Sequence, residues 1–190
     1  MEKKKKRIII GTFVALILIG AACAGTVYYY LFAPQFHPQR TVYIYIDRDD
    51  TADSIYNKVK QQGHPRSFTG FRWMAQYKKY SENIHTGRYA IRPEENVYHV
   101  FSRLYRGYQE PMNLTVGSVR TLDRLARSVG KQLMIDSAEI AGLMNDSAFQ
   151  QKLGYNKETL PCLFIPETYQ VYWDMSAEEF FERMQKEHQK

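Results

Sequence analysis

A run of 25 residues without a charged side chain, Ile8 to Phe32, constrains this chain more than any other feature. A helix of about 20 apolar residues is long enough to cross the hydrocarbon core of a bilayer. Residues 1–7 (MEKKKKR) precede this run and contain five Lys or Arg residues. Since basic residues flank membrane helices on the cytoplasmic side, we expect residues 1–7 in the cytoplasm and residues 8–32 as a transmembrane helix. The bulk of the chain, from Pro34 onward, is then expected outside that membrane.

A cleaved signal sequence is the alternative interpretation of the same run. Small residues precede Cys23 in the segment Gly20-Ala21-Ala22, as they do before the cysteine of a lipoprotein signal. The apolar run continues for nine residues beyond Cys23, which is more typical of an uncleaved anchor. The second cysteine, Cys162, lies far outside the span, so no disulfide framework is predicted.

The charge of the chain is concentrated in its first seven residues. They carry five positive charges and one negative charge, or +4 of the net +6, which leaves +2 over the remaining 183 residues. Nucleic-acid-binding proteins gather basic residues into a patch or stripe, so no nucleic-acid partner is predicted. The five histidines are scattered, with no Cys or His at ligand spacing, and no phosphate-binding glycine loop is present. We therefore predict no metal and no cofactor, and catalysis would have to use carboxylates.

Beyond the apolar run, segments with strand and helix periodicity alternate, which predicts an α+β fold. Val42, Ile44 and Ile46 alternate with more polar residues, as in a strand with one buried face. Thr51 then precedes a helical pattern that ends near Gly63. The further elements expected are a helix at about 67–80, a strand at 87–91 (GRYAI), a helix before Gly107, helices near 137–144 and 147–153, and a C-terminal helix capped by Ser176.

The strand-then-helix pattern recurs 70 residues later in the chain. The strand positions fall onto Met112, Leu114 and Val116, and the capping Thr51 falls onto Thr121. Threonine caps and aliphatic periodicity are common, so shared physical requirements explain the match as readily as duplication does. Either origin predicts two small sheets or one shared sheet, with helices that begin near Thr51 and Thr121.

Three motifs outside the apolar run are more specific than this periodicity. They are the GRYAI strand with Pro93 and a helix that ends in RLYRG, the segment MNLTVGSVRTLDRLA, and the segment FIPETY at 164–169. With the single N-terminal span, these motifs make nearly all of the chain similar to the YceG-like endolytic murein transglycosylases of bacteria. The resemblance implies a LysM-like, glycan-binding module at 38–110 and the start of a YceG-like catalytic domain at 111–190.

The resemblance also implies a reaction and its partners. Members of this family cleave nascent peptidoglycan glycan strands at the inner membrane and leave 1,6-anhydro-N-acetylmuramic acid ends, and peptidoglycan synthases are expected partners. One carboxyl group protonates the glycosidic oxygen and then accepts a proton from the muramic acid 6-hydroxyl, which closes on the anomeric carbon without consuming water. A hydrolase would instead use two carboxyl groups that flank the bond. A single acid in an apolar, aromatic-lined pocket would therefore form a coherent site.

The sequence departs from the family at the position of that acid. The family glutamate, followed by glycine, falls where this chain has Pro161-Cys162, and neither residue transfers a proton. Glu167 is the nearby acid, so we predict it as the catalytic residue. The alternative for Glu167 is a structural role, in which it accepts backbone N–H hydrogen bonds in the turn after Pro166.

The chain is also shorter than the family pattern, whose members continue past FIPETY with further acid-bearing helices. We therefore expect an N-terminal half of a longer protein. The competing functions are a non-catalytic, membrane-tethered module that binds peptidoglycan or acts as a scaffold, and an interaction domain without sugar contact. Further glycan contacts are expected from exposed aromatic side chains, and stem-peptide contacts from arginines that otherwise form a solvated helix face. The residues concerned are Trp73, Tyr77 and Tyr80, and Arg103, Arg106, Arg120, Arg124 and Arg127.

Overall fold

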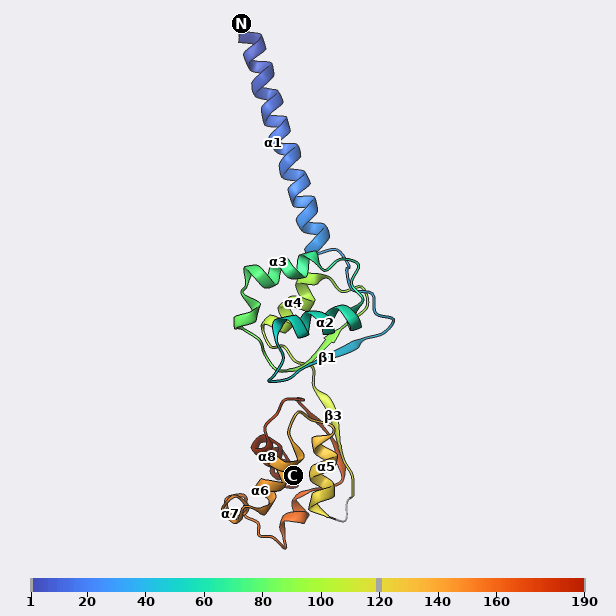
Figure 1. The fold of residues 1–190 in the computed structure, drawn as a ribbon, viewed down its shortest axis with the longest axis vertical. Coiled ribbons are helices and arrows are strands. Elements are labelled where there is room, and N and C mark those ends of the chain that lie inside the picture. The colour runs from blue at the N-terminus through green and yellow to red at the C-terminus, as the bar shows by residue number, and fades with distance from the viewer. Residues whose placement is uncertain (1, 119–120, 190) are drawn as a thin grey trace. The chain divides into compact units, whose positions relative to one another are not determined.

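The computed structural model describes residues 2–118 and 121–189, which form two compact units (Figure 1). The first unit comprises Met1–Ile44, Asp50–His85 and Ala90–Tyr108. The second unit comprises Tyr45–Asp49, Thr86–Tyr89 and Gln109–Lys190. Arg120, one of the arginines proposed to contact stem peptides, lies outside the described residues.

The N-terminal apolar run forms one long helix, α1 (Glu2–Leu31). Its segment Ile10–Leu31 is 22 residues long with a mean hydropathy of 2.2, which is long and apolar enough to span a membrane. Its apolar side chains are exposed along this length, for example Phe13 (67%) and Leu16 (66%). In water this exposure would oppose folding, whereas a lipid environment would accommodate it.

The strands and helices predicted between residues 42 and 107 are present in the structure. After α1, the chain continues through β1 (Val42–Ile46), α2 (Ala52–Gly63), α3 (Thr69–Tyr77), a 3₁₀ turn η1 (Tyr80–Glu82), β2 (Gly87–Ile91) and α4 (Val97–Tyr105), and β1 pairs with β2. Thr51 caps α2 in a reciprocal capping box with Ser54. The predicted helix at about 67–80 is divided between α3 and η1.

The first unit is held together by aromatic packing that includes one residue assigned to glycan binding. The ring centroid of Phe101 lies 5.4 Å from that of Phe71 and 5.6 Å from that of Tyr80, and all three side chains are buried. The prediction that Tyr80 faces a glycan is therefore wrong, because its side chain is fully buried. Trp73 (44%) and Tyr77 (84%) are exposed, as predicted.

One of the arginines assigned to a solvated face instead forms a half-buried ion pair. The Arg103 guanidinium donates to both carboxylate oxygens of Glu95, at 2.6 and 3.0 Å, and also to the carbonyl oxygen of Ala90. Burial raises the pKa of Glu95, but the hydrogen bonds from Arg103 and from the backbone N–H of Arg92, together with the charges of both arginines, outweigh it. The net result is a pKa below the ordinary value of a glutamate.

A lowered pKa in the folded state has a defined consequence for the pH dependence of stability. The Glu95 carboxylate stabilises the first unit above its unfolded-state pKa, and this contribution is lost as the pH falls through its lower folded-state pKa. We expect Arg103→Met to lower the free energy of unfolding at pH 7 by about 2 kcal/mol, because the carboxylate loses charged donors. We also expect a weaker acid dependence between about pH 5 and pH 3. Urea unfolding of the full chain in detergent micelles, over this pH range, measures both effects.

Arg106→Met is the matched control for this substitution. Arg106 follows α4 directly and is exposed, so its removal should change the free energy of unfolding by less than about 0.5 kcal/mol. An Arg103→Met chain that kept the wild-type acid dependence would contradict the role assigned to the Glu95 pair.

The main segment of the second unit, from Gln109 onward, contains two strands and four α-helices within the described residues. Its elements are β3 (Met112–Val116), α5 (Leu122–Gly130), α6 (Ser137–Asn145), α7 (Ser147–Leu153), a 3₁₀ turn η2 (Leu160–Leu163), β4 (Glu167–Val171) and α8 (Ala177–His188). Strands β3 and β4 are antiparallel, with Leu114 opposite Tyr169 and Val116 opposite Glu167. The predicted helices and the Ser176 cap of α8 are confirmed, whereas β4 was not predicted.

The expectation of two small sheets from the 70-residue recurrence is confirmed. The described residues form two two-stranded sheets, β1-β2 and β3-β4. Thr51 accepts a hydrogen bond from the N–H of Ser54, and Thr121 accepts one from the N–H of Arg124. Equivalent strand and helix positions are buried in the two segments: Ile44, Ile46, Ile55 and Val59 in the first, and Leu114, Val116, Leu125 and Val129 in the second.

Candidate functional site

Glu167, the predicted catalytic residue, is the first residue of β4, and its side chain is exposed. It shares one side of the strand with Tyr169 and Val171, which are buried, but it lies beyond the edge of that core. In the described residues, Glu167 therefore does not lie in the apolar pocket that was expected around it. Burial raises the pKa of Tyr169, and the charges of Glu167 and Glu187 raise it further, so the Glu167 carboxylate lies close enough to influence its neighbour.

The structural alternative for Glu167 also lacks contacts. Among the described residues, the Glu167 carboxylate accepts no hydrogen bond and forms no ion pair, so it does not cap the turn after Pro166. The Tyr169 hydroxyl closes this turn instead, by donating to the carbonyl oxygen of Ile165 at 2.7 Å. Glu167 is thus a solvated acid at the end of a sheet.

Pro161, at the position of the family glutamate, lies in the 3₁₀ turn η2 and is exposed. It borders a cavity of about 250 Å³ together with Phe164, Pro166 and Thr121. Glu167 is not among the residues that line this cavity. The family position and the predicted replacement acid therefore do not share a pocket in this unit.

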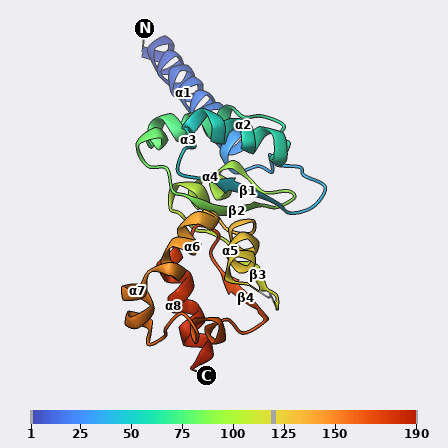
Figure 2. The ribbon, with the colours of Figure 1, turned by 60° about the horizontal axis from the view of Figure 1, so that its bottom comes forward.

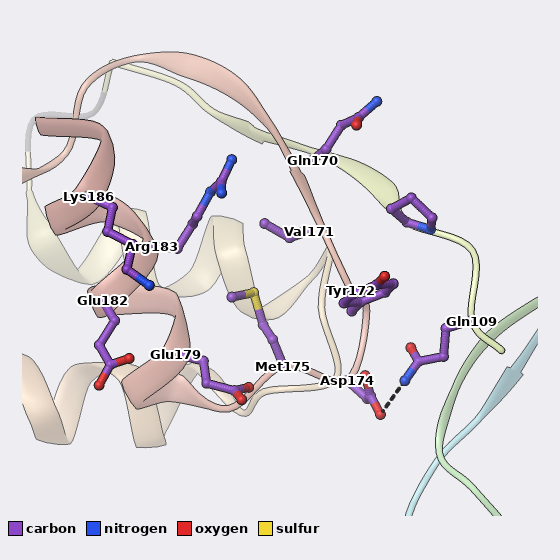
Figure 3. A pocket seen from close by; sticks show the side chains of 11 residues that line it. Gln109, Gln170, Val171, Tyr172, Asp174, Met175, Glu179, Glu182, Arg183 and Lys186 are labelled. Carbon is purple, nitrogen blue, oxygen red and sulfur yellow. Dashed lines mark hydrogen bonds between the residues drawn. The ribbon is translucent and has the colours of Figure 1, made fainter. Parts of the chain in front are cut away.

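A larger cavity, of about 890 Å³, lies between β4 and α8 (Figure 3). We call it the α8–β4 cavity. One side is formed by the end of β4 and the segment after it, and the other by the polar face of α8, as Figure 3 shows. The lining residues are Gln109, Pro111, Gln170, Val171, Tyr172, Asp174, Met175, Glu179, Glu182, Arg183 and Lys186.

Asp174 is held at one end of the α8–β4 cavity by two side-chain donors. Its Oδ2 atom accepts hydrogen bonds from Thr86 Oγ1 at 2.8 Å and from Gln109 Nε2 at 2.9 Å (Figure 3). Gln109 in turn lies against Gly87, where an added Cβ would be 2.2 Å from the Gln109 Cδ atom. Burial raises the pKa of Tyr89, and the Asp174 charge raises it further. Asp174 is therefore a fixed, hydrogen-bonded carboxylate.

The charged residues that α8 contributes to the cavity differ in whether their side chains already have hydrogen-bond or ion-pair partners. Glu179 is used in the capping box, where its carboxylate accepts from the N–H of Ser176 at 2.8 Å. Arg183 donates to Glu187 at 2.9 Å, an i,i+4 pair along the helix. Glu182 is exposed, and its carboxylate makes no hydrogen bond or ion pair within the described part of the chain. Glu182 is therefore free to accept hydrogen bonds from a ligand.

The lining of the α8–β4 cavity suits an extended polar ligand with hydroxyl and amide groups. Arg183, Lys186 and Gln170 supply donors, while Glu182 supplies an acceptor. Tyr172, which is 54% exposed, offers an aromatic face of the kind that stacks on a sugar ring. Within the described residues, no group of three or more His, Cys, Asp or Glu side chains gathers as metal ligands do. The cavity lining therefore offers donors, an acceptor and an aromatic face to a polar ligand.

The sequence predicted the C-terminal helix with its Ser176 cap but did not indicate this cavity. The available signal was the spacing of Glu179, Glu182, Arg183 and Lys186, which repeats at i, i+3, i+4 and i+7 and marks one polar face. The buried positions of α8 are Ala177, Phe180, Phe181 and Met184. What the spacing could not indicate is that β4 lies opposite that polar face.

Comparison with known proteins places most of the chain in one family. A model of the YceG-like family matches residues 44–190, and no curated protein matches the chain. Among solved structures, a crystal structure of a yceG-like protein from Listeria monocytogenes is similar, with 20% identity and a TM-score of 0.42. That match covers 79% of this chain but 55% of the Listeria chain, so this chain spans about half the length of that relative. The family model matches more than three quarters of the sequence, and the chain belongs to the YceG-like family.

Proposed function

We propose that this chain is a membrane-anchored endolytic murein transglycosylase that cleaves nascent peptidoglycan strands to 1,6-anhydro-N-acetylmuramic acid ends and so helps to terminate their elongation. Helix α1 would anchor it in the bacterial inner membrane, with the basic residues 1–7 in the cytoplasm and both units outside. The family match over residues 44–190 is the single observation that carries this proposal. Peptidoglycan synthases are the expected protein partners, since they produce the strands.

Two features of the structure support a glycan ligand. The α8–β4 cavity, at about 890 Å³, is within the usual size range of ligand sites and presents both donors and acceptors. The order β1–α2–α3–β2 between residues 42 and 91 supports the proposal of a LysM-like module at 38–110, which would bind the same glycan strands. The start of the catalytic domain would then occupy residues 111–190.

Glu167 stays our proposed acid for the cleavage step. Its carboxyl group would protonate the glycosidic oxygen, the bond to the anomeric carbon would break, and the 6-hydroxyl oxygen of the same muramic acid would close on that carbon. The resulting carboxylate would accept the proton of this hydroxyl, so the acid is regenerated and no water is consumed. The exposure of Glu167 leaves its carboxyl group accessible to a strand.

A non-catalytic, membrane-tethered glycan-binding module is the second candidate function. The exposure of the Glu167 side chain favours this second function. The acid of a lytic transglycosylase is expected in apolar surroundings, which Glu167 lacks in the described residues. Both functions predict binding to glycan strands, but only the transglycosylase predicts new anhydro-muramic ends.

We expect the full chain, in detergent micelles, to produce new anhydro-muramic ends on isolated uncrosslinked glycan strands, detected by mass spectrometry. Glu167→Gln should lower this activity by about 100-fold or more, because general acid catalysis contributes at least that much. Glu158→Gln is the matched control, since Glu158 is an exposed glutamate in a turn of the same unit, and it should keep wild-type activity.

The other outcomes decide between the candidates. Equal activity of Glu167→Gln and wild type would exclude Glu167 as the acid. Retention of strands on the immobilised chain without new ends would favour the non-catalytic module, and Glu182→Gln should then weaken retention by roughly tenfold, as expected for one lost charged hydrogen bond.

A further inference from the structure

The C-terminal end of α1 is built into the first unit and is not a free tether. Helix α3 crosses this end so closely that a Cβ added to Gly70 would lie 2.1 Å from the backbone oxygen of Tyr30. Buried Gln35 donates from Nε2 to the carbonyl oxygen of Tyr29 at 2.8 Å, and Pro34 forms a β-bridge with Asn96. Figure 2 shows α1 entering the unit beside α3.

Ring contacts join the same end of α1 to both α3 and α4. The ring of Tyr30 lies edge-to-face with that of Trp73, at a centroid distance of 5.1 Å. The ring of Phe32, just past α1, lies 5.5 Å from that of Tyr98 on α4. These contacts fix the direction in which α1 leaves the first unit.

Four aromatic side chains remain exposed around this junction, and we call them the aromatic collar: Phe32 (44%), Trp73 (44%), Tyr77 (84%) and Tyr98 (37%). Gly70, Trp73 and Tyr77 are spaced i, i+3 and i+7 on α3, so they share the helix face that meets α1. Lys78 lies beside the collar, with its Nζ atom 5.4 Å from the centroid of the Tyr77 ring. The collar is therefore a group of amphipathic and apolar side chains that begins at the end of the membrane-length helix and continues along α3.

We propose that the aromatic collar inserts into the headgroup layer of the same bilayer that α1 spans, and so docks the first unit on the membrane surface. This inference rests on the membrane anchoring stated under the proposed function. Tyrosine and tryptophan are enriched at this depth because their rings are apolar and their N–H and O–H groups stay hydrated. The lysine beside the ring would direct its ammonium group toward lipid phosphates.

Continuity with α1 is what favours lipid over a glycan as the occupant of this surface. The collar begins at Phe32, the last residue of the apolar run, and its α3 members follow Gly70 away from the helix end. A membrane helix that ends at Leu31 brings Phe32 to the lipid-water boundary by its rise, and the ring contacts hold Trp73 and Tyr98 beside it. A glycan ligand would need no such placement.

Tryptophan fluorescence tests the docking, because the chain has two tryptophans. The full chain carrying Trp173→Phe is reconstituted in phosphatidylcholine vesicles whose acyl chains are brominated near the headgroup. We expect Trp73 to lose about half of its emission or more, relative to unbrominated vesicles, as does a residue at the lipid boundary. The matched variant Trp73→Phe reports Trp173, which packs against Tyr45 outside the aromatic collar and so gives the quenching that arises without a collar residue.

Flotation of the same vesicles separates this inference from the membrane anchoring on which it rests. A chain that does not float with the vesicles contradicts the anchoring and the docking together. A chain that floats but keeps its Trp73 emission overturns the docking alone. Trp73 emission that responds to added glycan strands and not to the brominated lipid would also overturn it.

Discussion

Replacing Phe181 by alanine is expected to lower the free energy of unfolding of the second unit by about 3–5 kcal/mol. The Phe181 side chain is fully buried, and its ring lies 5.2, 5.9 and 5.5 Å from the rings of Phe149, Phe164 and Phe180. Alanine would remove these contacts and leave a cavity among side chains that come from three separate segments. Neither α8 nor the chain around η2 can move in to fill it without losing further contacts.

The effect should extend to the proposed glycan site, because the polar face of α8 lines the α8–β4 cavity while Phe181 holds the opposite face. Urea unfolding of the full chain in micelles, followed by Trp173 emission in a Trp73→Phe background, measures the second unit separately. Glu178→Ala is the matched control on an exposed position of α8 and should cost less than about 1 kcal/mol. A Phe181→Ala chain that unfolds at the wild-type urea concentration would contradict the packing described here.

The sequence predicted best those elements whose signal is local. The helix α4 was expected from apolar residues at helical spacing, and Val97, Val100, Phe101 and Leu104 are indeed its buried face. The caps of α2 and α5 were expected from Thr51 and Thr121, because a capping side chain bonds to an N–H only three residues away. Such features depend on neighbours in the sequence, so one sequence suffices to predict them.

Strand β4 was missed because its stability depends on a distant partner. Tyr169 and Val171 do alternate with exposed residues, but the apolar Leu163–Ile165 run and Pro166 before them obscure a period of two. The strand forms by pairing with β3, more than 50 residues earlier in the chain. The sequence also could not show that this pairing places β4 opposite the polar face of α8 and so creates the larger cavity.

The site prediction was limited by the same dependence on tertiary structure. Glu167 was selected by its motif, but it is exposed because the β3-β4 sheet ends at the pair formed by Val116 and Glu167. Tyr80 was expected to face a ligand because aromatic side chains stack on sugars, yet packing against Phe101 buries it. Residue type indicates what a side chain can do, and only the fold decides what it contacts.

Gly70→Ala is expected to destabilise the first unit, although alanine is the better helix former by about 1 kcal/mol. The added Cβ would lie 2.1 Å from the Tyr30 oxygen and 2.9 Å from its carbonyl carbon, which are backbone atoms that cannot rotate aside. Helix α3 must therefore shift away from the end of α1, and overpacking of this kind costs about 1–3 kcal/mol. The clash should outweigh the gain in helix propensity, so the net effect is a loss of stability.

Gly142→Ala is expected to have the opposite effect and to raise the stability of the chain. Gly142 lies inside α6, and a Cβ there would meet no other atom within 4 Å, so only the helix propensity changes and stability should rise by up to about 1 kcal/mol. Thermal unfolding of both variants in micelles, followed by circular dichroism, shows directly whether each substitution lowers or raises the stability. If Gly70→Ala separates α3 from α1, it should also reduce the quenching of Trp73 by brominated lipid, whereas Gly142→Ala should leave that quenching unchanged. Stabilisation by both substitutions would mean that α1 and α3 are not in close contact, and the first unit would then be tethered to the membrane without being docked on it.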